Sequence, residues 1–269
     1  MKYDLIVSDY DGTLIKKDGS ISLEQINAIS DYVALGGKFT VITGRMTTSI
    51  LPLVRKLGLK GYVSSFNGGE LAEIESGKIL YSIKIKNELA VKVYKAIEKE
   101  NAYAHGYYEG EYFAEKRTIF TDFYEKITGV KATLISEKLS EHFTNNGLDT
   151  NKILVMDEKE KLDKVMVALQ SFTRELNVIR SNDFQIEITE PTATKGNALK
   201  YIANTFNVKI ENSIAVGDGG NDCSMLKTAG LGIAVNNAEE ITKLTADVVL
   251  PYSNEQDAVR KIIELYALK

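Results

Sequence analysis

A run of apolar residues near the start of the chain ends in two carboxylates. Residues 3–8 read Tyr-Asp-Leu-Ile-Val-Ser, which is typical of a buried β-strand, and Asp9-Tyr10-Asp11-Gly12-Thr13 follow directly. In an open α/β sheet, ligands bind at the carboxyl ends of the strands. A carboxylate placed there can ligate a metal, attack an electrophile or move a proton. The segment therefore indicates an α/β fold with a reactive site at a strand end.

The composition excludes several classes of protein. The chain has 269 residues, enough for one large domain or two ordinary ones. A formal net charge of -4 gives no electrostatic footprint for nucleic acid or an anionic membrane. No apolar run approaches the ~20 residues of a spanning helix. Because a strand is expected almost at once, we expect no secretory leader, and Cys223 as the only cysteine predicts a reducing cytoplasm.

Strands and helices are expected to alternate over the first 66 residues. Ser22 and Gln25 are predicted to form a capping box for a helix that runs to about Leu35, which Gly36-Gly37 ends. The other elements expected here are a strand at 39–42, a helix at 47–57 and a strand at 61–66. This order predicts a parallel sheet with helices on both faces.

The pattern changes after Phe66. Hairpins are expected at 70–85 and, from two aromatic-rich runs, at 102–108 with 111–114, and a helix between them at 87–100. A strand, a long helix and two further strands are expected at 152–157, 158–176, 177–182 and 184–189. This middle stretch therefore has an α+β pattern of its own.

The parallel pattern resumes near Thr192. The expected elements are a helix at 194–206, a strand at 213–217, a helix from 221, strands at 231–235 and 246–250, and a helix at 255–267. We therefore predict a Rossmann-like, doubly wound α/β core formed by residues 1–83 and 189–269, interrupted by an inserted α+β domain at residues 84–188.

A second acidic loop follows the predicted strand at 213–217. It reads Gly217-Asp218-Gly219-Gly220-Asn221-Asp222. If both strands lie in the middle of one parallel sheet, Asp9, Asp11, Asp218 and Asp222 converge at its carboxyl edge. Carboxylates packed together repel one another unless a cation neutralises them. With only two histidines in the chain, ligation by oxygen is expected, which fits Mg²⁺.

Basic and hydroxyl groups follow two more of the predicted strands. Thr43-Gly44-Arg45 places a hydroxyl, a flexible glycine and a guanidinium just before a helix. Lys195 is expected in the first turn of another helix, where a cation opposes the helix dipole and requires a compensating anion. A phosphate at that helix N-terminus would supply one.

Together these groups have the chemistry of a phosphoryl-transfer site. Asp9, ionised at neutral pH, could attack phosphorus and form an aspartyl-phosphate. Asp11, two residues later on the same side of an extended segment, could protonate the leaving oxygen and then activate water.

With these segments assembled, the chain resembles the haloacid dehalogenase superfamily, in its branch of Cof-type phosphatases with a large inserted α/β cap. The resemblance covers nearly the whole chain and rests on four motifs: Asp9-Tyr10-Asp11-Gly12-Thr13, Thr43 in Val-Ile-Thr-Gly-Arg, Lys195-Gly196 and Gly217-Asp218-Gly219-Gly220-Asn221-Asp222. Two departures are Cys223, where relatives often carry an aliphatic residue, and Asn254-Glu255-Gln256-Asp257-Ala258, which lacks their usual Asp-Gly.

The resemblance implies a role for each site residue. Asp9 would be the nucleophile and Asp11 the general acid/base. Mg²⁺ would be held by the Asp9 carboxylate, the Asp11 backbone carbonyl and Asp218, and Asp222 would support the metal shell or Lys195. Phosphate and substrate contacts would come from Gly12, Thr43, Gly44, Arg45, Asn67, Lys195 and Asn221, with residues 84–188 as a cap that selects the leaving group.

We therefore predict a cytoplasmic, Mg²⁺-dependent phosphatase of a small phosphorylated metabolite, with sugar phosphates favoured by family tendency. The expected partner is a small phosphate ester, without nucleic acid or membrane, and the protein is expected to be a monomer or weak homodimer. One alternative is a phosphomutase that uses the same aspartyl-phosphate. The other is a binding or regulatory protein without catalysis.

Overall fold

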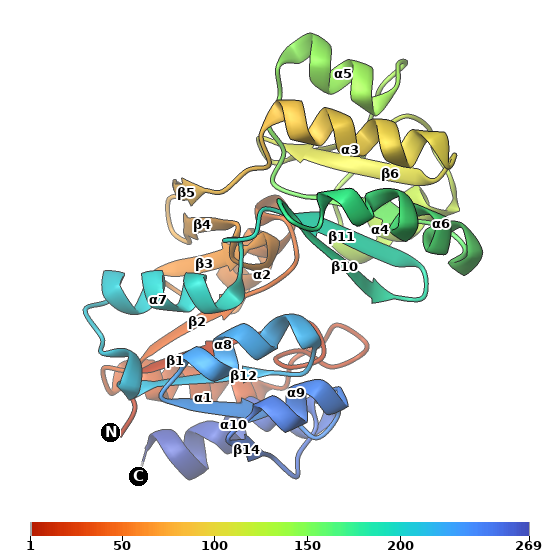
Figure 1. The fold of residues 1–269 in the computed structure, drawn as a ribbon. Coiled ribbons are helices and arrows are strands. Elements are labelled where there is room, and N and C mark those ends of the chain that lie inside the picture. The colour runs from red at the N-terminus through yellow and green to blue at the C-terminus, as the bar shows by residue number, and fades with distance from the viewer. Residues whose placement is uncertain (1, 269) are drawn as a thin grey trace. The chain divides into compact units, whose positions relative to one another are not determined.

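The structure, a computed structural model, describes residues 2–268 and divides into two compact units (Figure 1). The first unit contains Met1–Gly44, Leu51–Leu80 and Thr194–Lys269. The second contains Arg45–Ile50 and Tyr81–Ala193. The short segment Arg45–Ile50 thus groups with the second unit, although the sequence assigned it to the core. The domain limits expected at residues 84 and 188 stay a prediction.

The first unit is built on a sheet whose middle strand is β1 (Leu5–Ser8). On one side β1 pairs in parallel with β2 and on the other with β12, so the chain order reverses beside β1. Beyond β2, β3 pairs with β2 in parallel and with β4 antiparallel. The strand order is β14 (Val248–Val249), β13 (Leu231–Ala234), β12 (Ser213–Gly217), β1, β2 (Lys38–Ile42), β3 (Tyr62–Ser65), β4 (Glu70–Glu73) and β5 (Ile79–Ser82).

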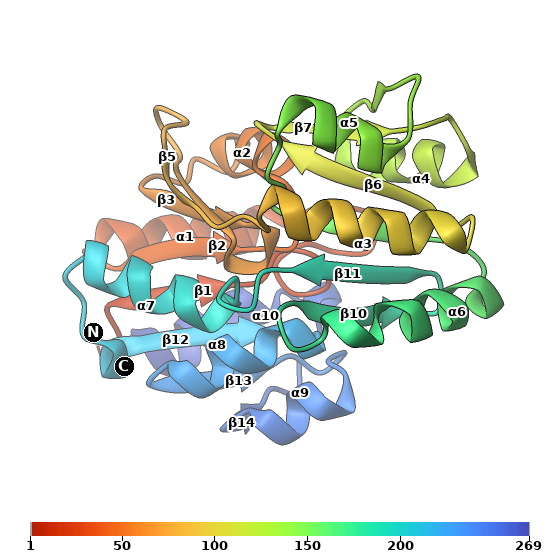
Figure 2. The ribbon, with the colours of Figure 1, turned by 45° about the horizontal axis from the view of Figure 1, so that its top comes forward.

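Helices cover both faces of this sheet. Figures 1 and 2 show α7 and α8 on the near face and α1 on the far face, and α1 packs against α10. The central strands β1, β2, β12 and β13 are mostly apolar and almost wholly buried, as strands covered on both faces must be. This arrangement confirms the predicted doubly wound α/β core. Its helices are α1 (Leu23–Ala34), α2 (Thr47–Lys56, which begins in the second unit), α7 (Lys195–Thr205), α8 (Cys223–Thr228), α9 (Glu240–Thr245) and α10 (Ala258–Ile262), continued by a π-helical turn at Ile263–Ala267.

The capping box predicted at α1 forms only by half. Ser22 is the N-cap, and its hydroxyl accepts a bond from the Gln25 amide at 3.0 Å. The Gln25 side chain instead donates to the Leu14 carbonyl at 2.7 Å and accepts from the Arg260 amide at 3.2 Å. Because Gln25 is buried, its side chain ties α1 to the loop after β1 and to α10 rather than to the helix end.

The second unit has a six-stranded sheet of its own. All its pairs are antiparallel except β7/β8, and the two predicted aromatic-rich runs form the β6/β7 hairpin. The strand order is β10 (Asn177–Asn182), β11 (Gln185–Thr189), β9 (Ile153–Met156), β6 (Tyr103–Tyr108), β7 (Glu111–Ala114) and β8 (Thr133–Leu134). Its helices are α3 (Asn87–Lys99), α4 (Ile119–Thr128), α5 (Leu139–Asn146) and α6 (Lys159–Leu169).

The helix α4 is oriented against its own hydrophobic pattern. Its buried residues include Thr121 and Glu125, whereas Ile119, Phe123 and Ile127 are exposed. Glu125 is held inside by bonds from Arg117 at 2.9 Å, Lys131 at 2.8 Å and the Ala132 amide at 3.0 Å. The sequence predicted no element between residues 115 and 151, where α4, β8 and α5 lie.

Among residues 2–268, no helix is both long enough and apolar enough to cross a membrane.

Candidate active site

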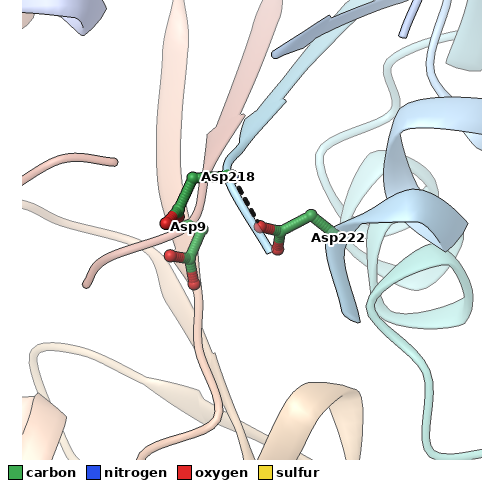
Figure 3. Close-up of side chains that lie close together, drawn as sticks. All are labelled: Asp9, Asp218 and Asp222. Atoms are coloured by element: carbon green, nitrogen blue, oxygen red, sulfur yellow. Dashed lines mark hydrogen bonds between the residues drawn. The ribbon is translucent and has the colours of Figure 1, made fainter. Parts of the chain in front are cut away.

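Two acidic loops meet where the strand order of the first unit reverses. Asp9 follows β1, and its amide donates to the Val216 carbonyl of β12 at 2.9 Å. Asp218 follows β12 directly. Because β1 and β12 are parallel neighbours, their carboxyl ends bring the two aspartates together, which is the usual place of a ligand site in such sheets. Figure 3 shows Asp9 and Asp218 side by side, with Asp222 close to them.

The three carboxylates form a compact acidic cluster. Asp9, Asp218 and Asp222 each offer an oxygen, and these oxygens lie within 4.8 Å of one another. Burial raises the pKa of Asp9 well above its usual value, against the opposing effect of Lys195. Burial also raises the pKa of Asp218 to about 6, despite the hydroxyl of Thr13, which donates to it at 2.7 Å. The cluster thus concentrates negative charge where water provides little screening.

Lys195 lies inside this cluster. It is the first residue of α7, after the N-cap Thr194, and its side chain is fully buried. The ammonium group is 2.5 Å from Asp9 Oδ1 and 2.5 Å from Asp222 Oδ1. Burial alone would lower the pKa of Lys195, but Asp222 and Asp9 outweigh it and raise the value. The predicted anion for Lys195 is therefore present as two carboxylates of the chain itself.

Both carboxylate oxygens of Asp222 are used by the protein. One oxygen accepts from Lys195, and the other accepts from the amides of Asp218 at 2.8 Å and Gly219 at 2.9 Å. These bonds fix the ammonium group and the conformation of the second acidic loop together. Of the two roles that the sequence left open for Asp222, the contacts favour support of Lys195.

Gly12 is required by its surroundings. Its φ is +77°, and a Cβ at this position would collide with the Asp218 carboxylate. Asn237 donates to the Gly12 carbonyl at 2.8 Å, which holds the turn from the far side. Asp11 lies next to this turn with an exposed side chain. Close approach of the two acidic loops therefore depends on the missing side chain of Gly12.

Two supporting residues were missed by sequence reasoning, Asn237 and Glu239. Glu239 donates its amide to the Asp218 carbonyl at 2.8 Å, and its carboxylate accepts from the Gly220 amide at 3.1 Å. Both residues follow β13, which pairs with β12. Position after a central strand was the one signal in the sequence that could have identified them.

Four other predicted site residues of the first unit form a second group. Thr43 is buried at the end of β2, and its carbonyl accepts from the Asn67 amide at 2.9 Å. The Asn221 side chain donates to Asn67 Oδ1 at 2.9 Å. A Cβ at Gly44 would lie 3.0 Å from that same oxygen. The structure thus brings together Thr43, Gly44, Asn67 and Asn221 through direct contacts.

Arg45 is placed differently from the other predicted residues. It belongs to the second unit, where its guanidinium donates to the Ile127 carbonyl at the end of α4 at 3.1 Å. Ser49 makes a similar bond to the Thr128 carbonyl at 2.7 Å. These contacts give Arg45 a structural task beside the substrate contact that the sequence suggested.

The acidic cluster has the chemistry of a divalent-cation site. Its donors are carboxylate oxygens, which hard divalent cations prefer. When Asp9, Asp218 and Asp222 are all ionised, the ammonium of Lys195 leaves two negative charges uncompensated. A divalent cation would neutralise this excess, so the residues present fit such an ion.

Comparison with known proteins places this chain in a family. A sequence model of the haloacid dehalogenase-like hydrolases matches residues 6–263. Phosphatase YwpJ of Bacillus subtilis is 28% identical over 274 residues, covering 93% of this chain and 95% of that protein. The 5-amino-6-(5-phospho-D-ribitylamino)uracil phosphatase YcsE of the same organism is 26% identical over 270 residues, with 98% and 96% covered.

A similar solved structure belongs to the same family. A haloacid dehalogenase-like hydrolase from Bacteroides thetaiotaomicron has a TM-score of 0.87 and 28% identity, covering 97% of this chain and 98% of that one. The similarity therefore extends over both compact units. The chain belongs to the haloacid dehalogenase-like hydrolase family, and it is an enzyme of the phosphoric monoester hydrolase type.

Proposed function

We propose that the protein is a Mg²⁺-dependent phosphatase that works through an aspartyl-phosphate on Asp9. The observation that carries this proposal is the position of the Asp9 carboxylate. It stands at the end of the central strand, bonded to Lys195 and next to the Asp218 carboxylate. The Lys195 ammonium opposes the rise in the pKa of Asp9 that burial causes, and so favours the charged form that a nucleophile requires.

The proposed reaction has two steps. An oxygen of Asp9 forms a bond to phosphorus while the ester P–O bond breaks, and Asp11 gives a proton to the leaving oxygen. Asp11 then takes a proton from water, which attacks phosphorus and releases phosphate from Asp9. The exposed side chain of Asp11 suits this exchange with bound molecules.

Other residues of the first unit would bind the phosphoryl group. Lys195, Thr43 and Asn221 would contact its oxygens, with Gly12 and Gly44 leaving room for the backbone to approach. Mg²⁺ would be held by the carboxylates of Asp9 and Asp218 and the carbonyl of Asp11, and would supply positive charge for the phosphoryl oxygens. Arg45 remains a candidate for contact with substrate, whereas Asn67 contacts Asn221.

For the substrate we propose a small phosphorylated metabolite, with sugar phosphates first. The name of the Bacillus subtilis relative YcsE contains a phosphorylated ribityl group, which supports this order. Residues 84–188 would act as a cap that selects the leaving group. We further propose a cytoplasmic location and a monomer or weak homodimer.

A panel of phosphorylated metabolites tests the proposal. Purified protein is expected to release inorganic phosphate from a subset of the panel and from an aryl phosphate, with Mg²⁺ and not with EDTA. A single-turnover measurement separates hydrolysis from mutase chemistry, since a mutase returns the phosphoryl group to an organic product. Absence of turnover on every ester would favour a binding or regulatory protein.

Stabilisation by Mg²⁺ is expected to depend on pH. Burial raises the pKa of Asp218 to about 6 in the folded protein, above its ordinary value of 3.8. Without metal, the folded state therefore retains a proton that the unfolded state loses, and this contribution to stability declines as pH rises from about 4 to about 6. Because Mg²⁺ binds the ionised carboxylate, the rise in melting temperature on adding Mg²⁺ should grow between pH 5 and pH 7.5.

The measurement is differential scanning fluorimetry with and without Mg²⁺ at each pH, with Ca²⁺ and Na⁺ as comparison cations. A Mg²⁺ effect of the same size at pH 5 and pH 7.5 would contradict a metal bound by Asp218.

Asp11→Asn is expected to slow hydrolysis without weakening the binding of Mg²⁺. The variant keeps the backbone carbonyl proposed as a ligand but removes the proton donor. General acid–base catalysis contributes roughly 10²- to 10⁴-fold to a rate, so a loss of this size is expected. The loss in kcat/KM, which reports the first step only, should be smallest for an aryl phosphate, whose leaving group does not require protonation. An equal loss for aryl and alkyl phosphates would argue against Asp11 as the acid.

A further inference from the structure

The turn between β3 and β4 has an unusual backbone. Phe66, Asn67 and Gly68 have φ values of +51°, +57° and +98°, so three consecutive residues are left-handed. A bulky residue such as Phe66 rarely adopts this conformation, and it persists only where the surroundings hold it. Such strained positions concentrate at functional sites. The strain therefore makes this turn a candidate for a functional task.

The contacts of the turn indicate this task. The Asn67 amide donates to the Thr43 carbonyl at 2.9 Å, and Asn67 Oδ1 accepts from the Asn221 side chain at 2.9 Å. A Cβ at Gly68 would collide with the Thr194 carbonyl, directly before Lys195. Three chain segments thus touch one turn, and each carries a proposed phosphoryl-binding residue.

We propose that Asn67 is a positioning residue that orients the Asn221 side chain toward the transferring phosphoryl group. This inference rests on the proposed function. Asn221 is exposed, and an exposed side chain rotates unless a bond restrains it. The bond to Asn67 Oδ1 occupies one of its two amide hydrogens and so fixes the direction of the other.

The left-handed backbone explains how Asn67 reaches this place. Its Oδ1 lies against Gly44, where a Cβ would be 3.0 Å away. Gly44 thus leaves the space into which the Asn67 side chain turns, and the Thr43 carbonyl holds its amide. Asn67 thereby couples the end of β2 to the second acidic loop.

Asn67→Gly separates positioning from folding. Glycine adopts a φ of +57° without strain, so the turn and the melting temperature should be preserved while the side-chain bond to Asn221 is lost. We expect kcat to fall roughly 10- to 100-fold, as a small misplacement of a binding group causes. The factor should be the same for sugar, alkyl and aryl phosphates, because the phosphoryl group is common to them.

A double-mutant cycle with Asn221→Ala tests the coupling. If Asn67 acts through Asn221, Asn67→Gly should change kcat less than about twofold in the Asn221→Ala background. Asn207→Gly is the matched control, because Asn207 is also left-handed, with a φ of +54°, but lies exposed after α7. The control should leave kcat unchanged.

Each outcome of these experiments either supports or overturns the positioning role of Asn67. Independent effects in the cycle, or a loss that varies with the leaving group, would show that Asn67 contacts substrate itself and would overturn this inference while the proposed function stands. A lowered melting temperature with unchanged kcat would also overturn it. A wild-type protein that hydrolyses no ester would overturn both the proposed function and this inference.

Discussion

Asp9→Asn is expected to abolish phosphate release while the protein remains folded. The amide is a poor nucleophile and cannot form the proposed aspartyl-phosphate, so turnover should fall by at least about 10⁴-fold. The variant keeps an oxygen for the bond from Lys195 and removes one charge of a crowded acidic cluster. We therefore expect the melting temperature to change little, and the measurement is phosphate release with saturating Mg²⁺.

Asp4→Asn is the matched control for this variant. Asp4 directly precedes the first residue of β1, at the end away from Asp9, and its carboxylate accepts from the Asn212 side chain at 3.0 Å. Its replacement should leave turnover unchanged. If Asp9→Asn retained more than about one percent of wild-type turnover, covalent catalysis by Asp9 would be excluded.

Lys195→Met is expected to reduce both activity and stability. Methionine fills a similar volume but leaves Asp9 and Asp222 buried without their cation. Removing one partner of a buried ion pair costs roughly 3–5 kcal/mol, so the melting temperature should fall by about 10 °C. Loss of a preorganised positive group should lower kcat by roughly 10²- to 10³-fold.

The exposed residue Lys200 on the same helix provides the comparison. Lys200→Met should change neither quantity, because exposed substitutions have small effects. Added Mg²⁺ should restore part of the stability of Lys195→Met, since it supplies positive charge to the same carboxylates. A melting temperature equal to wild type without Mg²⁺ would contradict the buried ion triad.

The sequence predicted the first unit well because its signals are local. Apolar runs of strand length identify the strands, and the chain order then restricts the topology. β12 has the predicted limits, as does β10 in the second unit, while β14 is only Val248–Val249 within the expected 246–250. The two acidic loops could be placed together because parallel strands share one carboxyl edge.

Sequence reasoning missed α4, and the hydrophobic pattern of this helix also misleads about which of its faces is buried. Ile119, Phe123 and Ile127 recur at helical spacing and would be expected in a core, yet they are exposed. Glu125 is inside because Arg117 and Lys131 satisfy its charge there. Which face of such a helix is buried depends on partners that are distant in space, which periodicity cannot show.

The order of strands and polar loops along the chain by itself determined the α/β fold, the meeting of Asp9 with Asp218, and the chemistry that these residues suggest. Only the tertiary structure decided that Lys195 joins Asp9 to Asp222, that Asn237 holds Gly12, and that Asn67 bonds to Asn221. The physical reason is that residue type and spacing fix which groups reach one sheet edge, whereas hydrogen-bond partners within a few ångströms depend on the packing of segments far apart in the chain.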